Sequence, residues 1–259
     1  MKSSRASGTK RAPKRSLVSK PKHPAPTLAA LRAEIHALAE PERGDHSQRF
    51  FKTGPGQYGE GDKFLGLTVP QMRVLVRKYR DLDDASALEL LASSWHEERS
   101  IALLLLVQGY ERGDETRRNR IHRAYLANTT RINNWDLVDA SAGQIVGAHL
   151  DASDIALLKR LAKSKSLWER RIAIVSTFYF IRRDEFRPTL EIAELLLGDS
   201  EDLIHKAVGW MLREVGKRDR RALDRFLEKH YARMPRTMLR YAIERHPEGT
   251  RKRYLAGTI

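Results

Sequence analysis

Three of the four tryptophans fall in the central part of the sequence and stand three or four residues before a charged side chain. The pairs are Trp135 with Asp139, Trp168 with Arg171, and Trp210 with Arg213. Residues at these separations share one face of an α-helix. Indole rings beside a carboxylate or a guanidinium can hold a cationic substrate by cation–π contact. A tryptophan at helical spacing is also an ordinary core residue, and that alternative stays open for each one taken singly.

The helices that would carry these side chains recur along the chain. Segments that resemble one another put Ser100, Arg171, Lys206 and Arg240 at equivalent positions, with separations of 71, 35 and 34. The first separation is about two periods, and residues 134–139 fall near its midpoint. A period of this length predicts an α-solenoid, because one helix pair cannot bury its apolar face alone. We therefore expect an all-α, HEAT-like helical-repeat solenoid with a basic, concave DNA-binding face.

Five further segments are expected to form the first helix of each pair. They span residues 85–92, 117–126, 154–162, 189–197 and 222–231. Apolar residues with a period near 3.6 begin at Leu28, and residues 69–75 indicate a helix with proline in its first turn. No stretch shows sustained strand alternation. We expect a single domain over residues 28–259.

The charge of the sequence indicates a polyanion partner. The 259 residues include 48 basic and 33 acidic side chains, a net charge of +15. Residues 1–27 hold eight of the basic residues and no acid, so the remainder still carries +7. Nucleic acid is the most frequent partner of such a chain. We expect residues 1–27 to be a disordered tail, since they can bury little apolar surface. This tail is either an arm that raises DNA affinity, a solubilising leader or, as a weaker option, a transit peptide.

Residue types argue against several kinds of site. The chain has no cysteine, and its nine histidines show no close ligand pairing, so we expect neither a metal nor a cofactor. The longest apolar run, residues 101–107, is far too short to span a membrane. We expect an intracellular monomer. The glycine-rich segment 53–63 lacks the ending of a P-loop, which favours a flexible loop that touches DNA over a nucleotide site.

Three central motifs resemble the AlkD family of bacterial HEAT-like repeat alkylpurine DNA glycosylases. They are residues 134–139 (NWDLVD), 167–174 (LWERRIAI) and 205–214 (HKAVGWMLRE), and residues 64–73 (FLGLTVPQMR) resemble an earlier family segment. The similarity runs from about Arg49 to Arg245 and leaves out the tail. The resemblance implies an enzyme that removes N3- or N7-alkylated purines from damaged double-stranded DNA. It also implies that the base is not flipped and that an abasic site remains.

The resemblance assigns roles to individual residues. Asp139 matches the catalytic carboxylate, and Trp135 and Trp210 match the two aromatic groups that cradle the sugar and backbone of the lesion. Arg171 matches the arginine that grips DNA beside the lesion. Phe50 stands where a family member has a tyrosine, which puts a polar role at that position in doubt. Trp168, Lys206 and Arg213 match motif positions that serve either packing or backbone contact. Arg240 is a further candidate DNA-binding residue from the repeat period alone.

Two non-catalytic alternatives stay open. A HEAT-like module can bind DNA or protein without chemistry, because a fold alone establishes no reaction. A scaffold resembling armadillo proteins would bind an extended peptide on its concave face. The combination of Trp135, Asp139 and Arg171 favours the enzyme, since a binding-only relative would be expected to lose the carboxylate. The preferred lesion is not determined by the sequence.

Overall fold

The computed structural model describes residues 26–259, so the expected disordered tail lies almost wholly outside the described residues. Within this range the chain is helical, and the only extended pairing is an isolated bridge between Lys63 and Trp95. The helices are α1 (Leu28–Ala37), α2 (Pro41–Phe50), α3 (Val69–Lys78), α4 (Asp84–Leu91), α5 (His96–Arg112), α6 (Glu115–Ala127), η1 (Thr129–Arg131), α7 (Trp135–Asp139), α8 (Ala142–Ile145), η2 (Gly147–His149), α9 (Ala156–Ala162), α10 (Leu167–Ser176), α11 (Phe178–Ile181), α12 (Arg187–Leu195), α13 (Asp202–Arg218), α14 (Arg220–His230), η3 (Tyr231–Arg233), α15 (Arg236–Ala242) and α16 (Glu248–Ala256).

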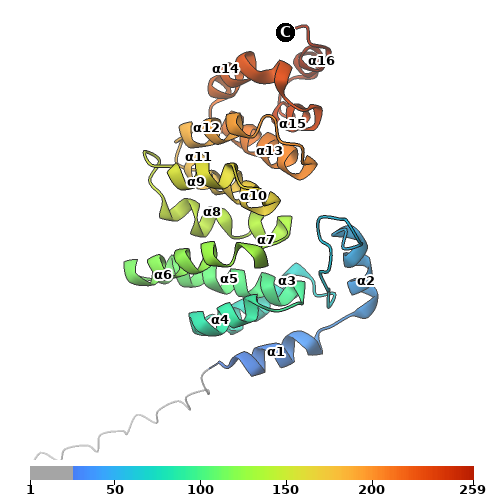
Figure 1. The fold of residues 1–259 in the computed structure, drawn as a ribbon, viewed down its shortest axis with the longest axis vertical. Coiled ribbons are helices and arrows are strands. Elements are labelled where there is room, and N and C mark those ends of the chain that lie inside the picture. The colour runs from blue at the N-terminus through green and yellow to red at the C-terminus, as the bar shows by residue number, and fades with distance from the viewer. Residues whose placement is uncertain (1–25) are drawn as a thin grey trace, which may run out of the picture.

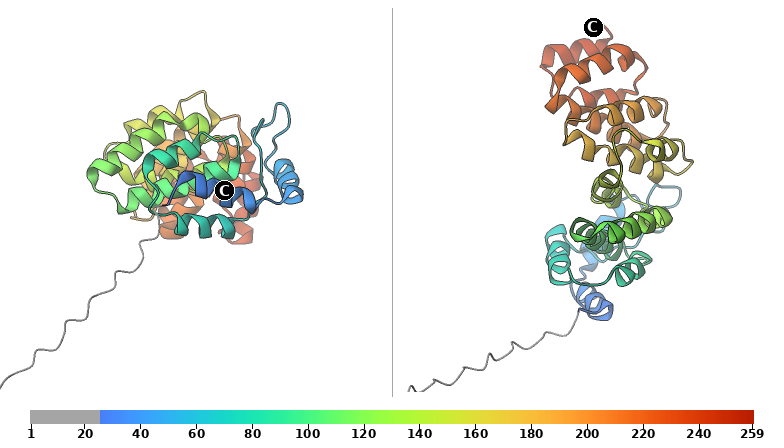
Figure 2. Two further views of the ribbon diagram at one scale, coloured as in Figure 1. Left: turned by 90° about the horizontal axis from the view of Figure 1, so that it is seen from below. Right: turned by 90° about the vertical axis from the view of Figure 1, so that its left-hand side faces the viewer.

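The helices stack in chain order along the long axis of the molecule (Figure 1). An outer layer consists of α4, α6, α9, α12 and α14, which coincide with the five segments expected to begin each repeat. An inner layer consists of α5, α7, α10, α13 and α15, with α10 packed on α13 and α13 packed on α15. This arrangement confirms the all-α helical-repeat solenoid. Helix α2 and the segment that follows it stand to one side of the stack (Figure 2).

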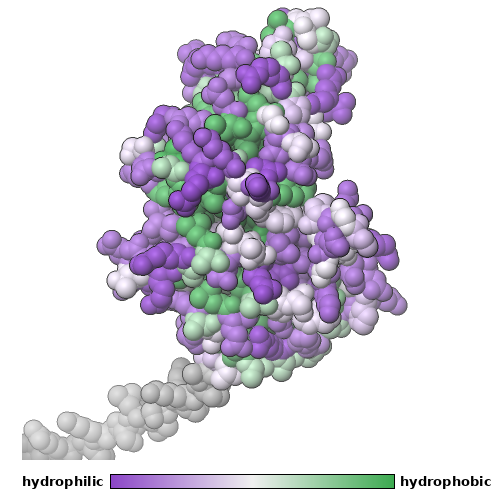
Figure 3. All heavy atoms as spheres, viewed as in Figure 1, coloured by the Kyte–Doolittle hydropathy of each residue, from purple (hydrophilic) through white to green (hydrophobic). Residues whose placement is uncertain are grey.

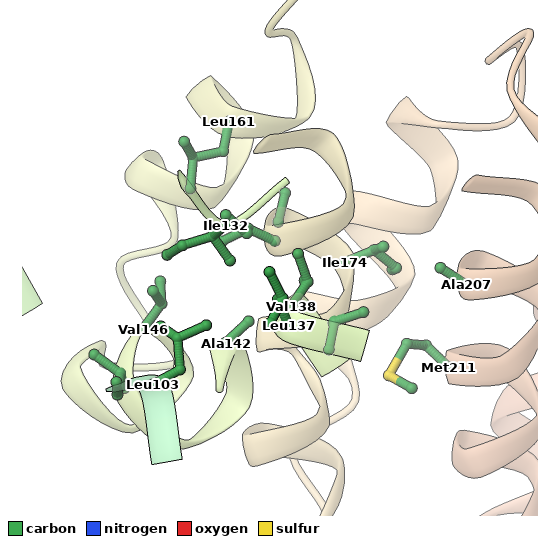
Figure 4. Packing of buried hydrophobic residues seen from close by; sticks show 14 of the residues in the cluster. Leu103, Ile132, Leu137, Val138, Ala142, Val146, Leu161, Ile174, Ala207 and Met211 are labelled. Atoms are coloured by element: carbon green, nitrogen blue, oxygen red, sulfur yellow. The ribbon is translucent and has the colours of Figure 1, made fainter. Parts of the chain in front are cut away.

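Apolar side chains fill the seam between the layers and between successive repeats. Leu137 and Val138 of α7 lie with Ile174 of α10 and Met211 of α13 in a continuous buried cluster (Figure 4). Burial of each such side chain stabilises the fold by about 1.5–3 kcal/mol. The space-filling view shows apolar surface mainly in the grooves between hydrophilic ridges (Figure 3).

A glycine allows the backbones of two inner-layer helices, α13 and α15, to come into direct contact. A Cβ added at Gly209 of α13 would lie 2.5 Å from the carbonyl oxygen of Met238 in α15. No larger residue fits at such an approach, because real Cβ atoms do not come within 3.0 Å of backbone. This contact fixes the spacing of the last repeats, which carry Lys206 and Arg240.

The N-terminal caps of α3 and α7, two helices near the candidate site, are formed by polar side chains that precede each helix. Thr68 and Gln71 form a capping box at the start of α3, with Pro70 in the first turn as expected. Helix α7 has only five residues and starts after Asn134, whose buried side chain accepts a hydrogen bond from the Trp135 N–H at 2.9 Å. Asp139 is its last residue, so the expected placement of Trp135 and Asp139 on one short helix is confirmed.

The charged residues that open α5 are buried and join the N-terminal helices to the stack. Glu97 accepts hydrogen bonds from the backbone N–H groups of residues 65–67 at 2.9, 2.7 and 3.2 Å. Glu98 binds Nε2 of His36 at 3.0 Å. These carboxylates satisfy backbone and side-chain donors that burial would otherwise leave without partners.

Candidate active site

Asp139 at the end of α7 forms a two-point ion pair with Arg171 of α10. Nε of Arg171 donates to Oδ1 at 2.9 Å, and Nη2 donates to Oδ2 at 2.8 Å. The third nitrogen, Nη1, donates to the carbonyl oxygen of Leu203 in α13 at 2.6 Å. The side chain of Arg171 is 6% exposed and that of Asp139 is 19% exposed. Arg171 therefore connects three successive repeats through hydrogen bonds with Asp139 and Leu203, and the Asp139 side chain stays partly exposed.

Two opposing effects set the acidity of Asp139. Burial raises the pKa of its carboxyl group, whereas the charge and hydrogen bonds of Arg171 lower it. Nearby Asp136 adds to the increase, and the net pKa lies above the ordinary value of 3.8. A carboxylate of this kind is a stronger proton acceptor than a free aspartate, and its orientation is fixed by the guanidinium.

The indoles of Trp135 and Trp168 face the segment that precedes α3. The ring of Trp135 stacks on Phe51, with centroids 5.3 Å apart and an interplanar angle of 17°. Phe50, which is 58% exposed, meets Trp135 edge-on at 6.1 Å. Trp168 meets the ring of Tyr58 edge-on, also at 6.1 Å. Both tryptophans are half-buried, so each keeps part of its ring available to a ligand.

Trp210 has a separate set of neighbours further along α13. Its indole N–H donates to Glu214 at 3.1 Å, and its ring lies 5.9 Å from that of Phe178. None of these contacts reaches Asp139. A shared role of Trp135 and Trp210 around the carboxylate therefore stays a prediction.

Of the other basic candidates, Lys206 and Arg240 lie at the surface and Arg213 is half-buried; Lys206 and Arg213 have acidic partners. Lys206 forms an ion pair with Asp202 at 2.7 Å and is 41% exposed. Arg213 binds Glu244 and lies 3.7 Å from Glu214. The repeat period predicts that Lys206 and Arg240 lie in one row with Arg171. In the structure Arg171 differs from the others, because it is buried and its donors are already used within the protein.

A buried network of charged side chains joins the glycine-rich segment to α7. Nδ1 of His96 lies 3.1 Å from Asp62, and Nε2 lies 2.8 Å from Asp136. Arg99 donates to the other oxygen of Asp62 at 2.6 Å. Burial opposes the charge on His96, but Asp136 and Asp62 outweigh it and raise its pKa to about 9. The imidazolium therefore links two aspartates at neutral pH.

Sequence reasoning did not single out this network. His96 belongs to a run of four charged residues, 96–99, before a long apolar stretch. Such a run is typical of the solvated first turn of a helix, whereas here all four residues are buried. The available signal was that the run is followed almost at once by residues 101–107, the longest apolar run of the sequence, which leaves little room for a solvated turn.

The described residues offer no cluster suited to a metal. Within residues 26–259, no three histidine, aspartate or glutamate side chains gather closely enough to hold an ion. In the same range, none of the helices combines the length and apolar character needed to cross a membrane.

Comparisons with known proteins agree with this architecture. Residues 31–246 match the model of a family described as DNA alkylation repair enzyme. Among solved structures, a predicted DNA alkylation repair enzyme from Enterococcus faecalis is similar, with a TM-score of 0.64 and 16% sequence identity. The match covers 81% of this chain and 97% of that chain, and at this identity the likeness is one of fold. A search of curated proteins gave no match.

Proposed function

The chain belongs to the DNA alkylation repair enzyme family, and from that premise we propose that it is a DNA glycosylase. Its substrates would be cationic N3- or N7-alkylated purines in duplex DNA, and its product an abasic site. The observation that carries this proposal is the Asp139 carboxylate, held at two points by Arg171 and still partly exposed. We place its action, as a monomer without a cofactor, in the bacterial cytoplasm and nucleoid.

The chemistry needs only a carboxylate. Alkylation at N3 or N7 gives the purine a positive charge, so the C1′–N bond breaks with its electron pair going to the base, and no general acid is required. An oxocarbenium-like sugar develops, and water attacks C1′. Asp139 faces the developing positive charge and accepts the proton of that water, for which its raised pKa is suited. One such preorganised group contributes on the order of 10²–10³ in rate, about 3–4 kcal/mol.

This contribution also explains selectivity for damaged bases. A rate factor of that size suffices for a bond that alkylation has already weakened. It is far too small for an undamaged nucleotide, whose base would leave as an anion. Lesion recognition would then depend on reactivity, and a shaped base pocket would not be needed.

Arg171 would act mainly through Asp139. Its planar fork holds both carboxylate oxygens, a geometry that a lysine does not reproduce. Direct contact with DNA would be limited to the small exposed part of its side chain. We therefore propose Arg171 as the residue that positions the carboxylate, with DNA contact as a secondary role.

The duplex would lie along the inner layer. Lys206, Arg213 and Arg240 would bind phosphates, while Trp135, Trp168 and Trp210 would contact the sugar and backbone around the lesion. Because Asp139 is accessible at the surface, a sugar can reach it while its base stays in the stack. This geometry supports excision without base flipping, unlike most enzymes that act on bases.

The test is incubation of the protein with a duplex that contains one N7-methylguanine. The proposal predicts release of the free base and strand breakage only after heat or alkali. Binding of the duplex without release would indicate a non-catalytic DNA-binding module. Displacement of DNA by acidic peptides would indicate a peptide-binding scaffold.

A further inference from the structure

The glycine-rich segment, residues 53–63, packs beside the candidate site, against Trp168 and the start of α7. Figure 1 shows it next to the inner layer, between α2 and α3. A Cβ added at Gly59 would lie 2.5 Å from the carbonyl oxygen of Phe51 and 3.3 Å from Nδ2 of Asn134, the residue that caps α7. Asp62 fastens the end of the segment to His96 and Arg99. The segment is therefore held against α7 by direct packing and by buried charges.

Tyr58 lies in the middle of this segment and meets tryptophans from two successive repeats. Its ring packs edge-to-face with that of Trp168, and the two ring centroids are 6.1 Å apart. Its hydroxyl group also lies near Trp135. An indole N–H can only donate, so Trp135 cannot accept the hydroxyl proton of Tyr58.

Within residues 26–259, the hydroxyl proton of Tyr58 has no well-placed acceptor. The carbonyl oxygen of Phe50 is 3.5 Å away, beyond the 2.5–3.0 Å of a well-formed O–H···O bond. Burial raises the pKa of Tyr58, so the group remains a donor at neutral pH. A half-buried donor in this state has capacity for an external acceptor.

The charges around Tyr58 favour an anionic acceptor. Lys206 and Arg171 are close enough to act on its hydroxyl electrostatically, and the Lys52 ammonium lies 6.0 Å from the centre of its ring. Asp136 is the opposing negative charge, and it is bound to His96. An oxygen of a DNA phosphate would meet this neutral donor beside the Lys52 ammonium, since Lys206 and Arg171 already pair with Asp202 and Asp139.

We propose that Tyr58 is a positioning residue that donates a hydrogen bond to a DNA phosphate beside the lesion. The same side chain packs against Trp168 through its ring. The position of that phosphate beside a lesion rests on the proposed function, whereas the contact with DNA does not. Because the donor is uncharged, its hydrogen bond adds affinity without releasing a counterion. Loss of Tyr58 should therefore leave the salt dependence of binding unchanged, whereas loss of a lysine would reduce it.

The experiment compares Tyr58→Phe with the wild-type protein in binding to an undamaged duplex over a range of salt concentrations. We expect roughly tenfold weaker binding at every salt concentration, the loss of one hydrogen bond to a charged group, with an unchanged slope of log K against log salt. Tyr231→Phe is the matched control, since Tyr231 is a half-buried tyrosine that packs on Tyr254. It should bind as the wild type does.

Base release separates this inference from the proposed function. With N7-methylguanine duplex in single turnover, Tyr58→Phe should need roughly tenfold more enzyme for half-maximal rate, because the phosphate contact is lost. Its rate at saturation should remain within a fewfold of wild type. Wild-type affinity of Tyr58→Phe, or a loss shared with Tyr231→Phe, would overturn the inference. Absence of base release by the wild type would refute the proposed glycosylase activity. The affinities of wild type and Tyr58→Phe for undamaged duplex would still decide whether Tyr58 contacts DNA.

Discussion

The two carboxylate oxygens of Asp139 are each bound by a different nitrogen of Arg171, which stands 32 residues later in the sequence and in the next repeat. The same guanidinium continues to the Leu203 carbonyl of the following repeat. The orientation of the carboxylate thus depends on the stacking of three repeats. A change in that stacking would act on the candidate chemistry without any change in the residues that contact DNA.

Replacement of Arg171 tests this dependence. Arg171→Gln should lower the saturating rate of base release by about 100-fold, because a misplaced catalytic group costs that much. The charge of Arg171 lowers the pKa of Asp139, so its removal should raise that pKa further. Since the ionised carboxylate is required, the acidic limb of the pH–rate profile should move to higher pH. Single-turnover rates measured from pH 4 to 8 check both effects.

Arg171→Lys is the companion variant for this measurement. It keeps the positive charge but loses the two-point geometry, so its rate should fall while its acidic limb shifts less than that of Arg171→Gln. An Arg171→Gln profile that overlies the wild-type profile would contradict the positioning role.

The buried histidine predicts a dependence of stability on pH. The pKa of His96 is raised from 6.5 to about 9 in the folded protein. Its contribution is therefore complete below pH 6.5 and is lost as pH rises through 9. Through this pKa shift, the free energy of unfolding should fall by about 3 kcal/mol between pH 6 and 10.

Urea unfolding of the wild type and of His96→Gln at both pH values measures this contribution. The free energy of unfolding of the wild type should fall by about 3 kcal/mol more than that of the variant. Equal losses in the two proteins would show that His96 is not held as an imidazolium between Asp62 and Asp136.

Lys206 should make a simple electrostatic contribution to DNA binding. Lys206→Ala should weaken the binding of damaged and undamaged duplex by the same factor, because phosphates carry no information about the base. The slope of log K against log salt should decrease by about 1. Titrations at several salt concentrations check both results.

A matched lysine lies in the outer layer. Lys159 of α9 forms an ion pair with Glu191, much as Lys206 does with Asp202, and its exposure is similar. Lys159→Ala should leave affinity and slope unchanged. If the two variants behave alike, Lys206 would have no place in the DNA-binding face.

The sequence predicts the helices well because their signals are local. The period of apolar residues and the recurrence of similar segments are sufficient to locate the outer helices and α10, α13 and α15. The spacing of Trp135 and Asp139 likewise predicts one helical face, and both lie in α7. These features depend on residues within a few turns of one another.

The partners of the charged side chains were not predictable in the same way. Arg171 was expected to contact DNA, yet its hydrogen bonds are with Asp139 and the Leu203 carbonyl. Tyr58 lies in a segment whose glycines are its main sequence signal, and these do not indicate the contacts of the tyrosine. Which charge meets which depends on the register between repeats and on how the segment before α3 packs across α7, and neither is encoded by short-range spacing.

Ionised Asp139 is proposed to carry the reaction, so Asp139→Asn should remove base release and leave DNA binding intact. The decisive experiment measures the single-turnover release of N7-methylguanine from a duplex, together with the Kd for the same duplex, with Asp151→Asn at an exposed position as a control. Release should fall by on the order of 10²–10³ while Kd stays close to the wild-type value. Release at the wild-type rate by Asp139→Asn would exclude this carboxylate from the mechanism.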